Sequence, residues 1–237
     1  YEMLKDPVCS DLDARRLKAI AERAHAYAVE MDFRFLYDTK RKLFTIGYHI
    51  GSNTVDNSYY DLLASESRLA SFIAIAKDDV SVDHWFRLGR SLTATAGTRT
   101  LLSWSGSLFE YLMPALVMQT FPFTLLDQTH KGSVRRQIAY GAERGVPWGV
   151  SESAYAVRDR LHTYQYRGFG VPDRALKRGL SKELVIAPYA TGLAMLVDPR
   201  QSPKKRPTPA AEGGRGPYGL PTRLDGSRPC PGRAERT

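Results

Sequence analysis

The sequence has 237 residues, of which 43% are hydrophobic and 25% are charged, as in a folded soluble domain. No apolar run reaches the roughly 20 residues that a membrane-spanning helix needs. Two cysteines, Cys9 and Cys230, stand outside any zinc-like or disulfide-framework spacing, which favours a reducing compartment. We expect one main domain that does not itself cross a membrane, and the absence of an initial Met and of a leader pattern indicates a fragment.

The net charge of +9 is concentrated at the end of the chain. Residues 199–237 contain nine Lys and Arg but only three acidic residues, so the body of the chain is only mildly basic. This tail has a single aromatic residue, Tyr218, and therefore lacks the basic and aromatic surface that binds nucleic acid. We expect no nucleic-acid partner.

The same tail holds eight of the 14 prolines and six of the 19 glycines. Such a segment buries too little apolar surface to offset its ordering entropy. The sequence therefore predicts a domain over 1–198 and a disordered Pro/Gly/Arg-rich tail over 199–237. A change of reading frame near residue 200 would account for the abrupt change in composition.

Taken in chain order, the body reads as helices joined by loops. Apolar spacing predicts a helix over about 11–31, and Leu43–Ile50 predicts a strand that enters a turn. Thr124 with Asp127 has N-capping spacing, and Gly145 suits the end of the same helix. Further helices are predicted over about 58–76, 107–118 with a kink or boundary at Pro114, 152–162 and 186–197. No βαβ alternation or Gly-x-Gly-x-x-Gly occurs, so the predicted class is mostly α.

Glu66 is the first candidate for chemistry. In the predicted helix its neighbours three and four residues away are all apolar, and they are Leu62, Leu63, Leu69 and Ala70. A carboxyl group on such a stripe is desolvated, which raises its pKa as a general acid requires. The alternative is a buried structural glutamate paired with an arginine such as Arg68 or Arg99.

Glu152 is the second candidate, in the Gly/Pro-punctuated segment GVPWGVSESAY over residues 145–155. Trp148 could stack on a sugar face, and a helix starting near Glu152 would keep this carboxylate ionised as a nucleophile or base. The alternative is that Ser151 caps that helix while Glu152 merely complements its dipole.

Glu110 is a third candidate, early in the helix that follows Ser107. We assign it a supporting or substrate-contacting role, because it lacks the apolar surround of Glu66. Asp32 and Asp61 are lesser candidates, since both suit capping or ion pairing. The five histidines form no His-x-x-x-His pair, so the sequence predicts no metal. Tyrosines at 59, 60, 155, 164 and 166 suit either a sugar-binding cleft or half-buried packing.

Eight strings in the body carry a resemblance when they are read together. They are MDFRFLYD (31–38), SYYDLLASESRLASFIAIAK (58–77), HWFRLGR (84–90), LLSWSGSLFEYLMP (101–114), RQIAYGAERGVPWGVSESAY (136–155), YQYRGFGVP (164–172), LKRGL (176–180) and VIAPYAT (185–191). In this order they resemble the glycoamylase-like region of cyclic β-1,2-glucan synthases, which is related to endo-β-1,2-glucanases.

The resemblance implies an (α/α)6 barrel and a site that cleaves linear β-1,2-glucan and cyclises it by retaining transglycosylation. Glu66 matches the family's acid/base position and Glu152 its nucleophile position. The residues expected to contact the glucan are Tyr59, Tyr60, Asp61, Trp104, Glu110, Trp148, Tyr155 and Tyr166. The chemistry requires no cofactor. The expected partners are the glucan and the other domains of a larger membrane synthase, on the cytoplasmic face of the inner membrane.

The resemblance also sets limits on this expectation. A complete barrel needs about twelve helices, whereas the sequence predicts six or seven of about 11 residues each, so the barrel is expected to be partial and the chain inactive alone. Two alternatives stay open, an inverting endo-β-1,2-glucanase and a non-catalytic glucan-binding fragment. Retention requires carboxyl groups roughly 5 Å apart and inversion a wider gap, although proton delivery through a substrate hydroxyl would relax that rule.

Overall fold

The computed structural model describes residues 11–95, 97–158, 160–161, 164–182, 184–199 and 224–225. The predicted tail lies outside these ranges apart from Pro199, Leu224 and Asp225, so its disorder and the boundary near 198 stay predictions. Ser10, whose spacing to Asp13 resembles a capping box and predicts the start of the first helix, also lies outside them.

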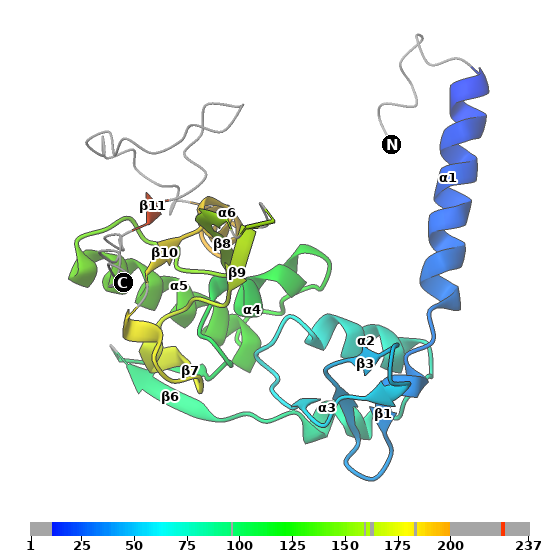
Figure 1. Ribbon diagram of the computed structural model, residues 1–237, viewed down its shortest axis with the longest axis horizontal. Helices are drawn as coiled ribbons and strands as arrows, with labels where there is room; N and C mark the ends of the chain where they lie inside the picture. Colours follow the sequence, from blue (N-terminus) through cyan, green and yellow to red (C-terminus); the bar gives the residue numbers. More distant parts are fainter. Residues whose placement is uncertain are drawn as a thin grey trace, which may run out of the picture.

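The chain begins with α1 (Asp11–Glu30), as the apolar spacing predicted. This helix stands away from the rest of the molecule (Figure 1). Its apolar side chains face solvent, with Ile20 65% and Tyr27 64% exposed. The short 3-10 turn η2 (Arg34–Leu36) then leads into the first strands.

Short antiparallel strands follow α1. A three-stranded sheet has the order β1 (Tyr37–Asp38), β2 (Leu43–Thr45), β5 (Tyr59–Tyr60). A separate hairpin pairs β3 (Tyr48–His49) with β4 (Thr54–Val55). The predicted strand over 43–50 is thus two strands, separated because Ile46 and Gly47 bond instead to Ser58 and Asp56 across the loop.

The predicted helix over 58–76 is correct only in its second half, which forms α2 (Arg68–Ala76). Residues 59–60 pair with β2, and Leu62 forms a parallel bridge with Gly89. These pairings hold the chain extended up to a turn over Ser65–Ser67. Glu66 therefore lies in the turn before α2. The helix α3 (Asp83–Arg87) completes this part.

Two helices that the sequence predicts form the centre of the molecule. After the hairpin β6 (Leu92–Thr95) and β7 (Thr98–Leu101), α4 (Leu108–Leu112) begins with a capping box and continues as the 3-10 turn η3 (Met113–Leu116) at Pro114. The long α5 (Leu125–Arg144) begins at Thr124, whose side chain accepts from the Asp127 amide, and ends at Gly145 with φ of 67°. These predictions are confirmed.

The predicted helix over 152–162 is wrong. Residues 153–158 form β8 (Ser153–Arg158), which pairs with β9 (Tyr164–Arg167). Pairing with the next strand in a hairpin overrides the local helical preference here. Two 3-10 turns, η4 (Pro172–Arg174) and η5 (Leu180–Lys182), follow. The predicted last helix forms as α6 (Pro188–Ala194), after β10 (Val185–Ile186), which pairs with β11 (Leu224–Asp225).

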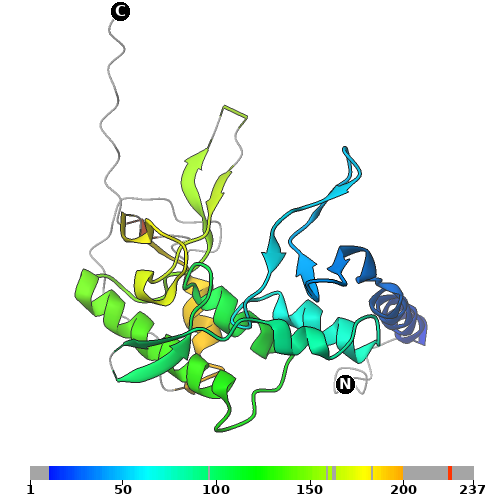
Figure 2. The ribbon, with the colours of Figure 1, turned by 90° about the horizontal axis from the view of Figure 1, so that it is seen from below.

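The largest core cluster joins two parts of the chain, the first with the elements up to α3 and the second with the elements from β6 onward. Leu63 and Ala64 from the segment before α2 pack with Leu108 and Leu112 of α4 and with Ala190 of α6. The β3–β4 and β8–β9 hairpins extend from the same side of the helices (Figure 2). The core therefore packs the Glu66 turn against α4 and α6. The segment before β8 contacts the same two helices, because Ser151 bonds to Phe109 and Tyr189.

The regular elements of the described residues are helices and five small sheets. The expectation of a mostly helical chain with a few short strands therefore understates the strands. No closed barrel forms among the described residues. In the same part of the chain, no helix combines the length and apolarity required to cross a bilayer.

Candidate active site

Glu66 owes its environment to the turn and the core beneath it. The two residues before Ser65, Leu63 and Ala64, are 4% and 0% exposed. The Ser65 hydroxyl donates to Glu66 Oε2 over 3.2 Å. Burial raises the pKa of the Glu66 carboxyl, and the negative charges of Glu110 and Glu152 raise it further. The raised pKa inferred from a helical stripe is thus present, but its cause is a buried turn.

Glu152 lies at the start of the β8–β9 hairpin on a backbone that is fixed before and after it. The Gln137 side chain accepts from the Val150 amide and donates to the Val150 carbonyl, both over 2.8 Å. Ser151 is fully buried, and its hydroxyl accepts from the Phe109 amide over 3.0 Å. Because the strand β8 follows Glu152, no helix begins at this residue, and the helix that both interpretations of Glu152 assumed is wrong.

Tyr60 links the two glutamates. Burial raises the pKa of the Tyr60 phenol, and the charges of Glu66 and Glu152 both contribute. Charge effects of this kind fall with distance, so Tyr60 and the two carboxylates share one region. The structure therefore brings together three predicted site residues from β5, the turn before α2 and the start of β8.

Glu110 lies beneath this region and is 3% exposed. Its carboxylate accepts from the hydroxyls of Ser103, Ser105 and Ser107 and from the amides of Ser105 and Ser107, over 2.7–3.0 Å. A carboxylate with five internal donors is held for structure. Of the two roles expected for Glu110, this geometry favours the supporting one.

The other residues predicted to contact the glucan differ in their surroundings. Trp104 is 60% exposed, whereas Trp148 is half-buried and packs against the core and the backbone at Gly141. The Tyr59 hydroxyl donates to Asp38 Oδ2 over 2.9 Å. The exposed Asp61 anchors the loop through its carbonyl, which accepts from the Gly89 amide. Tyr155 and Tyr166 lie on the paired strands β8 and β9.

Two residues near Glu152 were not predicted from the sequence. The Tyr189 hydroxyl donates to Ser151 Oγ over 2.9 Å and to the Glu152 carbonyl over 2.8 Å. Lys177 Nζ donates to the Gly168 carbonyl over 3.3 Å, beside the Glu152 carboxylate. A methyl group placed on Gly168 would lie 3.9 Å from Glu152 Oε1 and 3.8 Å from Lys177 Nζ. Tyr189 lies in the string VIAPYAT and Lys177 in LKRGL. Both strings contribute to the resemblance, but the sequence alone assigned neither residue a role in the site.

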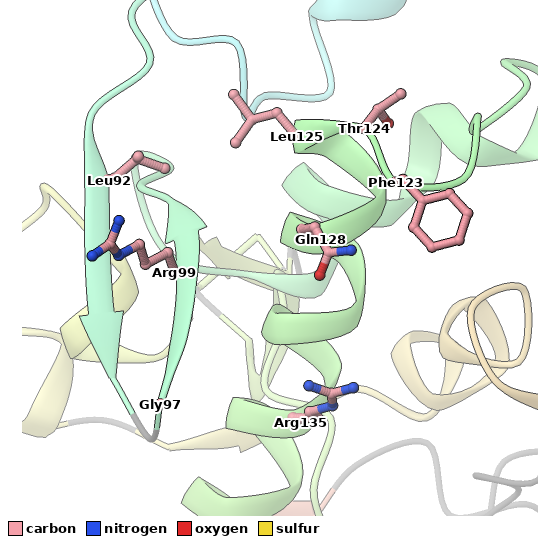
Figure 3. A pocket seen from close by; sticks show the side chains of 8 residues that line it. All are labelled: Leu92, Gly97, Arg99, Phe123, Thr124, Leu125, Gln128 and Arg135. Atoms are coloured by element: carbon pink, nitrogen blue, oxygen red, sulfur yellow. The ribbon is translucent and has the colours of Figure 1, made fainter.

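A separate hollow of about 430 Å³ lies between the β6–β7 hairpin and the start of α5 (Figure 3). Arg99 and Arg135 line it, together with Phe123 and Leu125, and none of the predicted site residues does. Among the described residues, no group of three or more His, Cys, Asp or Glu side chains is placed to hold a metal ion.

Comparison with known proteins identifies the class. The glycoamylase family, described as "Putative glucoamylase", matches residues 58–206. The match covers more than half of the chain and includes every predicted site residue except the lesser candidate Asp32. The chain belongs to the glycoamylase family and is thereby placed among carbohydrate-active domains.

The particular relative is a large synthase. The chain is 45% identical over 223 residues to the cyclic β-(1,2)-glucan synthase NdvB of Rhizobium meliloti (strain 1021). The aligned part covers 91% of this chain and 8% of the relative. The resemblance seen in the sequence is confirmed, and the chain corresponds to a small part of the synthase's length.

Proposed function

We propose that this chain carries the cyclisation site of a cyclic β-1,2-glucan synthase, where linear β-1,2-glucan is cleaved and closed with retention at the anomeric carbon. The observation that carries the proposal is that the Glu66 turn and the segment before Glu152 both pack onto α4. Arg68 Nη1 donates to the carbonyls of Ser65 and Glu110, and the Phe109 amide donates to Ser151 Oγ. The charges of both glutamates also raise the pKa of Tyr60, in keeping with common surroundings. The similarity to a cyclic β-(1,2)-glucan synthase supplies the substrate class.

In the first half of the proposed reaction, Glu66 donates a proton to the leaving glycosidic oxygen. Its raised pKa suits this role, because the group must hold a proton near neutral pH. Glu152 attacks the anomeric carbon as the glycosidic bond breaks, and a covalent glycosyl ester forms. The leaving chain segment departs with the proton from Glu66.

In the second half, a hydroxyl at the other end of the same glucan attacks the anomeric carbon of the ester. Glu66, now ionised, takes the proton of that hydroxyl, and the bond to Glu152 breaks. Two inversions at one carbon give net retention, and the product is a ring. If water enters in place of the hydroxyl, the product is a shorter linear chain, as in a hydrolase.

The surroundings of the two glutamates suit glucan binding. The exposed Trp104 offers a face on which a pyranose ring can stack, and we assign Tyr59, Asp61, Trp148, Tyr155 and Tyr166 to the same cleft. We further propose that the other domains of a larger membrane synthase complete the barrel, with this segment on the cytoplasmic face of the inner membrane. The low share of the relative that aligns supports the proposal that further domains accompany this segment.

The test separates catalysis from binding. Linear β-1,2-glucan is titrated calorimetrically into the chain and into a synthase-length polypeptide that contains it, and turnover is measured in parallel. Glu66→Gln and Glu152→Gln should each abolish turnover and leave affinity nearly unchanged. The matched control, Glu143→Gln, alters a carboxylate whose side chain is 56% exposed, and it should leave both unchanged. Binding without turnover in every form would leave only the glucan-binding alternative.

A further inference from the structure

Arg68 is the first residue of α2 and is only 2% exposed. Its Nη1 donates to the carbonyl oxygens of Ser65 and Glu110, both over 3.0 Å. Its Nη2 contacts the Tyr111 carbonyl over 2.6 Å and His130 Nε2 over 3.2 Å. One guanidinium therefore joins the Glu66 turn, the end of α4 and the helix α5.

The partners of this guanidinium are unusual for a buried charge. They are three carbonyl oxygens and a ring nitrogen, where burial of an arginine usually calls for a carboxylate. The carbonyls of Glu110 and Tyr111 lie in the last turn of α4, where carbonyls lack intrahelical partners and carry partial negative charge. The cation is stabilised there, and its planar fork holds the three segments at fixed separations.

The connection continues from α4 to Glu152. The Glu110 carboxylate holds the loop Ser103–Ser107 through five hydrogen bonds, and that loop packs against Gly168–Gly170. A methyl group on Gly170 would lie 1.8 Å from the Ser105 carbonyl oxygen. A methyl group on Gly168 would lie 3.9 Å from both Ser105 Cβ and Glu152 Oε1. Close contacts therefore lead from the Glu66 turn to the Glu152 carboxylate.

We propose that Arg68 is a positioning residue that, through α4 and Glu110, sets the separation of Glu66 and Glu152 in the active site. The inference rests on the proposed function, because it assigns Arg68 a role in that reaction. Arg68 takes no part in bond making. It fixes the Ser65 carbonyl, and with it the backbone from which the Glu66 side chain extends.

The test compares Arg68→Lys with Arg174→Lys. Lysine keeps the charge but lacks the planar fork that reaches four acceptors. Arg174 is a matched control because it is also 2% exposed, and its side chain donates to Thr100 Oγ1 of β7. Glucan turnover is measured in the synthase-length polypeptide. Hydrogen exchange is measured on the same variants without substrate.

The expected result for Arg68→Lys has two parts. Amide exchange should accelerate at Arg68 and Leu69, whose N–H groups donate to the carbonyls of Ser65 and Glu66. Turnover should fall about 100-fold through kcat with little change in KM, as misplacement of a reacting group by about 1 Å produces. Arg174→Lys should leave both the exchange of this turn and kcat near those of the unsubstituted protein.

Each contrary outcome is decisive. Unchanged exchange at Arg68 and Leu69 would overturn the proposal, because the turn would then not depend on the fork. Faster exchange with an unchanged kcat would also overturn it and leave Arg68 a purely structural role. If the unsubstituted polypeptide does not act on β-1,2-glucan, the proposed function fails by itself, and the exchange measurement still shows whether Arg68 holds the turn.

Discussion

Three glutamates in this chain differ through what surrounds them. Glu66 lies in a turn over a buried Leu-Ala pair, so desolvation raises its pKa. Glu110 is deeper and accepts five hydrogen bonds. Glu152 extends from a backbone held by Gln137 and Tyr189. The same functional group is thus suited to proton transfer, to structure or to attack according to its partners.

The buried Glu110 carboxylate gives a direct stability prediction. Glu110→Gln replaces one acceptor oxygen with an amide that cannot accept, so serine donors around it lose their partner. We expect the free energy of unfolding to fall by about 3 kcal/mol, measured by urea denaturation. Glu143→Gln, at a carboxylate that is 56% exposed in its ion pair with Arg136, should cost less than about 1 kcal/mol. Equal effects of the two changes would contradict the structural role of Glu110.

His130 gives a pH prediction. Its pKa is lowered from 6.5 to about 4, first by burial and then by the charge of Arg68. The ring is neutral in the folded protein near pH 7. Because Arg68 can only donate, Nε2 is the acceptor and Nδ1 carries the proton towards Thr120 Oγ1.

The sign of the effect follows from the lowered pKa. As the pH falls from 6.5 towards 4, the unfolded chain binds a proton at His130 that the folded chain does not bind. This contribution to stability is therefore complete above pH 6.5 and is lost on acidification, by up to about 3 kcal/mol. His130→Gln should flatten the decline in unfolding free energy over this range. An unchanged slope in the variant would show that His130 is not its source.

At the scale of elements, helices with strong local signals were predictable. Thr124, Asp127 and Gly145 marked both ends of α5, and the Ser107 and Pro114 signals marked α4 and its boundary. The errors lie where strand pairing decides the structure. Residues 59–62 pair with β2 and Gly89, and residues 153–158 pair with β9. Neither partner can be recognised from local spacing.

The contrast between local signals and tertiary packing also explains which residues of the site could be predicted from the sequence. The helical pattern that favours Glu66 in the sequence does not form around it, yet its apolar neighbours Leu63 and Ala64 are buried in the core. Tyr189 and Lys177 escaped prediction, because their proximity to Glu152 arises only when α6 and the loop after β9 pack beside β8. Composition can identify a desolvated carboxylate, but not the partners that tertiary packing brings to it.

The contact between the loop Ser103–Ser107 and the chain after β9 gives an element-scale prediction. Gly170→Ala would place its methyl group 1.8 Å from the Ser105 carbonyl oxygen, so the two segments must separate. We expect a loss of about 3 kcal/mol in unfolding free energy. The control Gly192→Ala lies in α6 with nothing within 4 Å and should stabilise by about 0.5–1 kcal/mol. A neutral Gly170→Ala would contradict this packing.

At the scale of the whole molecule, the candidate site needs both parts of the chain. The first part supplies Tyr60 and Glu66, and the second supplies Glu110, Glu152 and Tyr189. The shared core of Leu63 and Ala64 with α4 and α6 holds these parts together. The glycoamylase family match begins at residue 58, immediately before β5. The matched region therefore includes every group assigned to the chemistry.

The most direct test of the central claim is the identity of the products. Linear β-1,2-glucan is incubated with a synthase-length polypeptide that contains this chain, with its Glu66→Gln and Glu152→Gln variants, and with the 237-residue chain alone. Mass spectrometry distinguishes a ring, which is lighter than the linear chain of equal length by one water. We predict rings from the unsubstituted polypeptide and none from either variant. Shorter linear chains alone, or rings that persist in Glu152→Gln, would contradict the account.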